Sequence, residues 1–335
     1  MELATIGFCY SSSVRNTVHN QTLIAITGAN GFIGSFLVRS LESDGSRVRR
    51  LVRNGGVDGR CHAVGDLAAE PEWLESLRGV DTVVHCAAFA EKPEGPLATE
   101  RLFRVNRDAV AALAKACQDV GVRRLIFLSS VKVYGEVSSD QGGFSEADTL
   151  SPDDDYGMSK AEAEQLLLAG GCAKNLDVCV LRLPLVYGPG VKGNFARLMR
   201  LAYRGMPLPL ASVDNRRSLL GLDNLAAVVA ALVLDERKLN DVFNVADPTT
   251  MSTPELLRSL GSARHCTPRL FRFPVPLLRV AARMVGVSAS FAKLTESAVV
   301  NTTKLAAALP NLRLAPTDEL IRRYFSDCSA ANGVQ

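Results

Sequence analysis

Short apolar runs rich in β-branched residues alternate with segments of helical periodicity through the first two-thirds of the chain. The runs that predict strands are residues 22–27, 47–52, 81–86, 124–130 and 178–183, and the helical segments include residues 36–43, 108–120 and 156–169. Strands that are apolar on both faces and joined by helices imply a parallel sheet covered by helices on both sides. The chain is therefore predicted to be an α/β protein with a Rossmann-like, doubly wound parallel sheet.

This regular alternation ends near Pro184, which suggests a second, smaller unit. We expect residues 1–20 to form a poorly ordered leader, residues 21–184 a dinucleotide-binding domain, and residues 185–330 mainly a C-terminal substrate-binding lobe. A strand near residues 242–246 is expected to return to the sheet. The apolar segment 273–287 contains two prolines and two arginines, so it is too short and too charged to span a bilayer. It predicts an amphipathic helix at an interface.

Charge and cysteine usage exclude several classes of protein. The 38 basic and 35 acidic residues give a net charge of +3 with no long run of one sign, so no nucleic-acid surface is expected. The eight cysteines are scattered, without a C-x-x-C pair or a histidine cluster. They predict reduced thiols in a cytoplasmic protein and no metal site.

A glycine motif follows the first predicted strand and opens a helix. Gly28, Gly31 and Gly34 permit a tight turn and allow a pyrophosphate to approach the helix N-terminus. The spacing is G-x-x-G-x-x-G, not G-x-G-x-x-G. Arg53 ends the second strand, where NAD-binding proteins usually carry an acid, so NADP is favoured and NAD is the alternative. Further cofactor contacts are expected from Asn30, Phe32 and Ile33.

A second motif supplies proton chemistry. Tyr156 and Lys160 lie four residues apart, so both project from one face of a helix. A tyrosine with a pKa near 10 is a poor base, but a nearby ammonium group and an oxidised nicotinamide favour its phenolate. Such a pair can move a proton while a nicotinamide exchanges a hydride with a carbonyl or alcohol.

Over residues 22–325 these motifs resemble the extended branch of the short-chain dehydrogenase/reductase superfamily, the NAD-dependent epimerase/dehydratase family. The resemblance implies that Ser130, four residues before Tyr134 of a Val-Tyr-Gly turn, holds the substrate oxygen, whereas Ser129 is an ordinary strand-end residue. The proline usual before Tyr156 is Asp155 here, which predicts a changed loop with intact chemistry. The resemblance implies further cofactor-site residues at Asp66, Leu67, Ala87, Ala88, Asn106 and Pro184.

The same resemblance indicates the substrate side. Sugar-nucleotide 4,6-dehydratases carry an Asp-Glu pair after their catalytic threonine, and this chain has Val131 and Lys132, so dehydration is not expected. Lys132 is a candidate substrate contact. Asn194 and Arg217 match residues that bind the diphosphate, and a guanidinium suits two phosphate oxygens. For Arg217, a solvated loop charge is the alternative.

Within the branch, the chain looks most like enzymes that act at C4 of UDP-N-acetyl sugars in bacterial surface-polysaccharide synthesis. The leading prediction is a UDP-4-keto-6-deoxy-N-acetylhexosamine 4-reductase that uses NADPH. The alternative is a UDP-glucose or UDP-N-acetylglucosamine 4-epimerase with tightly bound NAD. Tyr134 is usual in 4-epimerases, whereas that reductase group often carries Asn there, so both predictions stand. An NADP-sensing scaffold is disfavoured because Tyr156 and Lys160 are both present, and a homodimer is implied by the resemblance alone.

Overall fold

The computed structural model describes residues 22–55, 61–90, 93–138, 142–169 and 175–326. Its centre is a seven-stranded sheet in the order β10-β6-β5-β4-β1-β2-β3, in which every neighbouring pair is parallel. The strands are β1 (Leu23–Thr27), β2 (Arg47–Val52), β3 (Cys61–Ala63), β4 (Thr82–His85), β5 (Arg124–Ser130), β6 (Asp177–Leu183) and β10 (Asp241–Asn244). The predicted Rossmann-like α/β fold and its five strands are confirmed.

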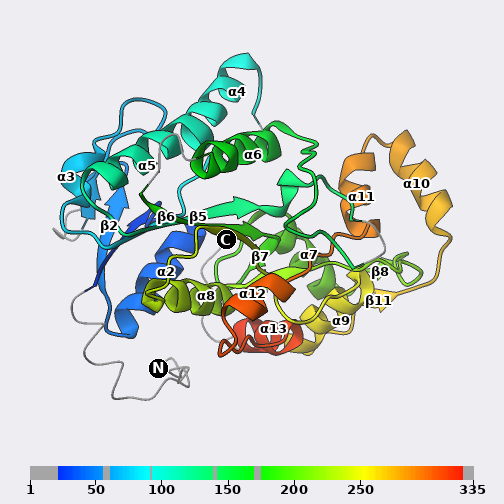
Figure 1. Ribbon diagram of the computed structural model, residues 1–335. Helices are drawn as coiled ribbons and strands as arrows, with labels where there is room; N and C mark the ends of the chain where they lie inside the picture. Colours follow the sequence, from blue (N-terminus) through cyan, green and yellow to red (C-terminus); the bar gives the residue numbers. More distant parts are fainter. Residues whose placement is uncertain (1–21, 56–60, 91–92, 139–141, 170–174, 327–335) are drawn as a thin grey trace.

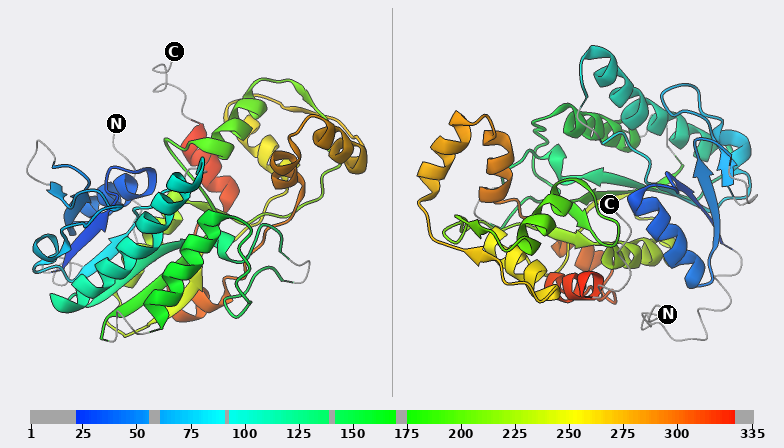
Figure 2. Two further views of the ribbon diagram at one scale, coloured as in Figure 1. Left: turned by 90° about the horizontal axis from the view of Figure 1, so that it is seen from above. Right: turned by 180° about the vertical axis from the view of Figure 1, so that it is seen from behind.

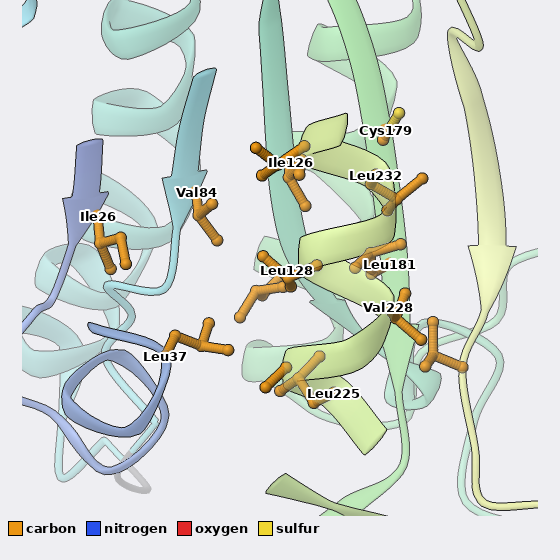
Figure 3. Packing of buried hydrophobic residues seen from close by; sticks show 14 of the residues in the cluster. Ile26, Leu37, Val84, Ile126, Leu128, Cys179, Leu181, Leu225, Val228 and Leu232 are labelled. Carbon is orange, nitrogen blue, oxygen red and sulfur yellow. The ribbon is translucent and has the colours of Figure 1, made fainter. Parts of the chain in front are cut away.

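Helices cover both faces of this sheet (Figure 1). One face carries α2 (Phe32–Ser43), α8 (Leu222–Leu234) and α12 (Thr303–Ala308), and the other carries α3 (Trp73–Leu77), α5 (Ala109–Asp119) and α6 (Asp155–Leu168). Leu225, Val228 and Leu232 of α8 pack toward the strand residues Ile126 and Leu181 (Figure 3). Burial of apolar side chains on both faces explains why the strands read as continuous apolar runs.

Two helical segments differ from the sequence expectation in their bounds. Helix α2 begins at Phe32, four residues earlier than the periodicity predicted, because the glycine-rich turn leads directly into it with Gly31 as the N-cap. Helix α5 is preceded by α4 (Pro96–Phe103) and by a π-helical turn at Arg104–Asp108. Such turns frequently lie at functional sites.

The remaining elements form a lobe beside the carboxyl ends of the strands, and Figure 2 shows it from two further sides. Two small parallel sheets pair β7 (Leu185–Tyr187) with β9 (Leu219–Gly221) and β8 (Pro207–Leu208) with β11 (Arg269–Leu270). The helices are α7 (Gly193–Tyr203), α9 (Thr253–Ala263), α10 (Val275–Met284), α11 (Ser288–Thr295) and α13 (Thr317–Phe325). This lobe has its own apolar cluster around Tyr187, Phe195 and Leu257.

The predicted leader at residues 1–20 lies outside the described residues. Among the helices that are described, none combines the length and the apolar character needed to cross a lipid bilayer. Among the described cysteines, those at positions 86, 117, 179 and 266 are free thiols.

Candidate active site

The glycine motif forms a tight turn between β1 and α2. Gly28 has a φ of +62°, a conformation that favours glycine, and its carbonyl accepts a 2.8 Å hydrogen bond from the Gly31 amide. A Cβ at Gly28 would lie 2.9 Å from Ala87 Cα, and one at Gly34 only 2.2 Å from the Gly28 carbonyl oxygen. The first turn of α2 therefore packs directly against the glycine-rich loop that precedes it. Because its unpaired amides point outward there, the turn fits a pyrophosphate.

The other predicted residues of this loop differ in exposure. Asn30 and Gly31 are exposed, and Phe32 and Ile33 are half-buried. Thr27, which the sequence left without a role, joins β1 to the residues after β4. Its Oγ1 accepts hydrogen bonds from the amides of Cys86 (3.1 Å) and Ala87 (3.2 Å) and lies 2.9 Å from His85 Nδ1. The backbone at Ala87 and the exposed Ala88 is thereby held beside the glycine turn.

His85 is fully buried behind this turn. Burial, reinforced by the charge of Lys160, lowers the pKa of its imidazole to about 3. The ring is therefore neutral at pH 7, and it supports Thr27 by a hydrogen bond.

Residues near the end of β2 form the expected adenosine side. Arg53 is exposed there, and its carbonyl accepts a 3.1 Å hydrogen bond from the Gly65 amide. The Asp66 carboxylate accepts from the Ala68 amide (3.1 Å) and pairs with Arg101 of α4 (2.7 Å), and these partners lower its pKa. Leu67 is half-buried beside it. Asp66 is therefore anchored within the protein, whereas the Arg53 guanidinium faces solvent.

Helix α6 brings Tyr156 to the end of β5. Its N-cap is Asp154, whose carboxylate accepts a 2.7 Å hydrogen bond from the Gly157 amide. A Cβ at Gly157 would lie 2.6 Å from the Lys132 carbonyl oxygen, so α6 begins in contact with the short 3₁₀ turn Val131–Val133. Ser130 precedes that turn, and its Oγ accepts from the Lys132 amide at 3.2 Å. The structure thus brings the predicted Ser130 and Tyr156 to one place.

Lys160 lies one turn further along α6 and is only 2% exposed. Its Nζ donates a 2.9 Å hydrogen bond to the Leu128 carbonyl and stands 4.6 Å from the centroid of the Phe127 ring. Burial lowers the pKa of this amine to about 8, against the opposing charge of Glu164. Burial, together with the Asp154 carboxylate, raises the pKa of Tyr156 to about 12. At pH 7 the pair is therefore a phenol and an ammonium group.

A buried polar network lies behind these residues, and we call it the inner network: Ser129, Tyr134, Glu164, Arg182 and Asn244. Arg182 forms a fork with Glu164, with a shortest contact of 2.6 Å, and donates to the Tyr134 hydroxyl at 2.7 Å. Tyr134 in turn donates to Asn244 at 2.9 Å. Ser129, expected to be an ordinary strand-end residue, instead donates to Glu164. Tyr134 is only 5% exposed, so its hydroxyl is buried within the inner network.

Asn106 lies in the π-helical turn and is completely buried. Its side-chain amide accepts from the Phe89 amide (2.8 Å) and donates to the Phe89 carbonyl (3.0 Å) and to Ser159 Oγ (3.1 Å). These bonds tie the loop after β4 to α6. Asn106 therefore holds the loop at Phe89 and the helix at Ser159 in fixed positions behind the site.

A second group of charges stands in front of Tyr156, and we call it the outer cluster: Lys132, Glu136, Asp154 and Lys293. Lys132 pairs with Asp154, and its Nζ lies 5.8 Å from the centroid of the Tyr156 ring. Glu136 lies 3.9 Å from Lys132 and 3.2 Å from Lys293 of α11. Their side chains are between 32% and 40% exposed. Asp154 was visible in the sequence only as part of an acidic loop.

The predicted phosphate contacts lie in the second lobe. Arg217 is half-buried, and one guanidinium nitrogen donates to the carbonyls of Lys293 and Glu296, both at 3.0 Å. Burial lowers its pKa, and the Glu136 charge opposes that shift, so Arg217 lies on the side of the outer cluster. Asn194 is exposed in the first turn of α7, and Pro184 is buried between β6 and β7. The structure thus groups Ser130, Lys132, Tyr156 and Lys160, and Arg217 contacts α11, the helix that carries Lys293 of the outer cluster.

Comparisons with known proteins show the family to which the chain is related. The model of the NAD dependent epimerase/dehydratase family matches residues 24–246. A UDP-glucose 4-epimerase of Vibrio cholerae is 40% identical over 264 residues, which cover 76% of this chain and 79% of that protein. A ceramide reductase of Caulobacter vibrioides is 31% identical, over 78% of this chain and 77% of that protein.

Solved structures also match along nearly the whole chain. MoeE5 in complex with UDP-glucose and NAD is 26% identical, with a TM-score of 0.70 over 90% of this chain and 97% of that chain. A UDP-N-acetylglucosamine 4-epimerase from Bacillus cereus has a TM-score of 0.74 at 22% identity, over 94% and 99% of the two chains, and supports the fold alone.

Proposed function

This chain belongs to the NAD dependent epimerase/dehydratase family, the extended short-chain dehydrogenases/reductases, and on that premise we propose that it is a 4-epimerase of a UDP-linked hexose. The observation that carries the proposal is the 40% identity to a UDP-glucose 4-epimerase, which extends over more than three-quarters of both chains. The grouping of Ser130, Tyr156 and Lys160 supports it, because this set can deprotonate an alcohol and reprotonate it.

The cofactor would be held by the glycine turn. The outward-facing amides at the start of α2 would bind the pyrophosphate, and the backbone after β4 would line the nicotinamide end. Bound NAD would accept a hydride from the sugar carbon and return it to either face. The close approaches at Gly28 and Gly34 keep this turn tight, because a Cβ at either position would meet the protein's own backbone.

Proton movement would depend on three side chains. Ser130 would hold the C4 oxygen by a hydrogen bond, and Tyr156 would take the hydroxyl proton and later give it back. Because burial raises the pKa of Tyr156 to about 12, its phenolate needs a nearby positive charge. Lys160, whose pKa is about 8, retains that charge at neutral pH. Lys132, 5.8 Å from the Tyr156 ring centroid, would add a second positive charge on the side of the sugar phosphates.

A second candidate function is the reduction of a UDP-4-keto-6-deoxy-N-acetylhexosamine with NADPH. The observation that favours it is Arg53, an exposed guanidinium at the end of β2 in the position where a 2′-phosphate would be bound. Tyr156 would then donate a proton to the C4 oxygen and be reprotonated from solvent before the next turnover. The cytoplasmic location and the homodimer expected from the sequence stay predictions.

One experiment separates the two candidates. Purified protein is incubated with UDP-glucose or UDP-N-acetylglucosamine without added cofactor, and in parallel with UDP-4-keto-6-deoxy-N-acetylhexosamine and NADPH. Interconversion with the corresponding C4 epimer in the first reaction supports the epimerase. Stoichiometric consumption of NADPH in the second reaction, without epimerisation in the first, would refute it in favour of the reductase.

The assigned proton transfer is tested with Tyr156→Phe. We expect turnover to fall by about 10²–10⁴-fold, while bound nicotinamide, measured after protein denaturation, stays at the wild-type ratio. Met158→Ala is the control, because Met158 is a 44% exposed residue of the same helix, and it should keep wild-type turnover. Full turnover in Tyr156→Phe would remove this tyrosine from the mechanism.

A further inference from the structure

The second lobe exposes an unusual concentration of large apolar side chains at its outer end. We call this set the α10 patch: Phe271, Phe273, Leu277, Val280, Met284, Val285 and Val287. Met284 is 85% exposed and Val285 73% exposed. The patch occupies 17 consecutive residues, and Figures 1 and 2 show α10 projecting from the lobe, away from the central sheet. Exposed apolar side chains this closely grouped indicate an interaction surface.

Helix α10 has two apolar faces, of which only one is used by the fold. Val275 and Leu278 are half-buried and Ala282 is buried, and their spacing places them on the inner face, toward α11 and the lobe core. Leu277, Val280 and Met284 have the same i, i+3, i+7 spacing on the opposite face, and all three are more than half exposed. The outer face is therefore apolar without contributing to the core of this chain.

The segment that carries the α10 patch has charges of a single sign. Residues 256–295 contain no aspartate or glutamate and seven cationic residues, although the whole chain has a net charge of only +3. The exposed cations nearest the patch in sequence are Arg269, Arg272, Arg279 and Arg283. None of these four arginines forms an ion pair with another described residue. Arg279 and Arg283, four residues apart, border the apolar face along one side of the helix.

We propose that α10 docks this protein onto a membrane surface that contains anionic phospholipids. A helix that presents an apolar face bordered by arginines lies in the plane of the lipid headgroups, with its apolar side chains inserted and its cations on the lipid phosphates. A second copy of the chain fits this face poorly, because pairing two α10 patches would bring eight unneutralised arginines together. The absence of acids across forty residues matches a uniformly negative partner.

Binding is measured by flotation of the full-length protein with vesicles of equal parts phosphatidylglycerol and phosphatidylcholine, and with vesicles of phosphatidylcholine alone. We expect flotation with the anionic vesicles only, and its loss at about 0.5 M salt because exposed charges are then screened. Met284→Trp reports insertion directly. A blue-shifted emission is expected on the anionic vesicles, and the native Trp73, which is 4% exposed in the other domain, gives a constant background.

Two sets of variants test the two parts of the surface. Arg279→Gln with Arg283→Gln should weaken the partition coefficient by about 25-fold, since each interfacial arginine contributes about a factor of five. Leu277→Ser with Val280→Ser and Met284→Ser should abolish flotation. Leu97→Ser, at an 83% exposed leucine of α4, is the matched control and should float like the wild type.

Epimerase activity on a soluble UDP-sugar should be the same in all of these variants. Flotation is measured without reference to that activity, so it still tests membrane docking if the proposed function is wrong. Three results would overturn the docking proposal. They are no flotation of the wild type, unchanged flotation of the triple serine variant, or a concentration-dependent dimer that dissociates in the triple variant without any vesicle binding.

Discussion

The two sides of Tyr156 are built from similar residue types and differ in burial. Behind the tyrosine, Glu164 and Arg182 are 1% and 5% exposed in their side chains, and their polar atoms bind each other, Ser129 and Tyr134. In front of it, Lys132 and Asp154 also pair, but their side chains are 34% and 40% exposed. The inner network and the outer cluster are thus two ion-pair systems in different dielectric surroundings.

This difference in burial separates two tasks. Removing one partner of a buried ion pair leaves the other charge unpaired and away from water. An exposed pair contributes little to the stability of the fold and exchanges its partners readily. We infer that the inner network fixes the strand ends that carry Ser130. The outer cluster can exchange its internal pairs for the phosphates of a substrate at small cost.

The largest effect is expected from Glu164→Ala, which leaves Arg182 buried without its carboxylate. The free energy of unfolding should fall by about 3–5 kcal/mol in urea denaturation. Glu162→Ala on the same helix is the control, because Glu162 forms a pair with Arg107 that is about one-third exposed, and it should change stability by less than about 1 kcal/mol. Equal losses in the two variants would contradict the distinction between buried and exposed ion pairs.

Lys160→Met should abolish turnover and yet stabilise the fold. The folded protein holds this amine at a pKa of about 8, below its ordinary 10.5, so it binds fewer protons than the unfolded chain between these values. Below about pH 8 the buried charge therefore lowers the free energy of unfolding of the wild type by its full amount. This penalty disappears as the pH rises toward 10.5. We expect the methionine variant to be about 1–3 kcal/mol more stable at pH 7.

The advantage of the methionine variant should shrink when unfolding is followed at pH 9.5. In the wild type, kcat/KM should decline above about pH 8, as Lys160 loses its charge. A methionine variant that is less stable than the wild type at pH 7 would show that the buried amine is not costly.

Asp154→Ala should have an intermediate effect, because it removes both the α6 N-cap and the partner of Lys132. A lost cap costs about 0.5–2 kcal/mol, read as a lower Tm. Asp154→Asn retains the capping oxygen and removes only the charge, so it should recover most of the stability. If the asparagine variant is as unstable as the alanine variant, the ion pair and not the cap holds this end of the helix.

The smallest change in stability is expected from Lys132→Met, below about 1 kcal/mol, because its ion pair is partly exposed. Its effect should instead appear in KM for the UDP-sugar, which we expect to rise while kcat falls less. Val137→Ser, at a 52% exposed valine of the loop that follows, serves as the control for a general disturbance of this surface. A large drop in Tm for Lys132→Met would place this lysine among the structural residues of the inner side.

Several site residues follow from the sequence because their signals are local. A glycine required by a positive φ at position 28 and a Tyr-x-x-x-Lys pair on one helical turn are encoded by neighbours in the chain. The roles of Thr27 and Glu164 could not be predicted in this way. Their partners lie 58 residues away at His85 and 18 residues away at Arg182, and no spacing rule joins them.

The sequence alone determined the alternation of strands and helices, and with it the parallel sheet, the glycine turn and the Tyr-x-x-x-Lys pair, because local periodicity and backbone sterics govern each of them. The tertiary structure alone decided which charges are buried and which remain in water. It placed Tyr134 and Ser129 in the inner network, left Lys132 beside Tyr156, and turned an apolar face of α10 outward. Burial depends on packing between segments that are distant in the chain, and burial determines whether an ion pair holds the fold or is available to a ligand.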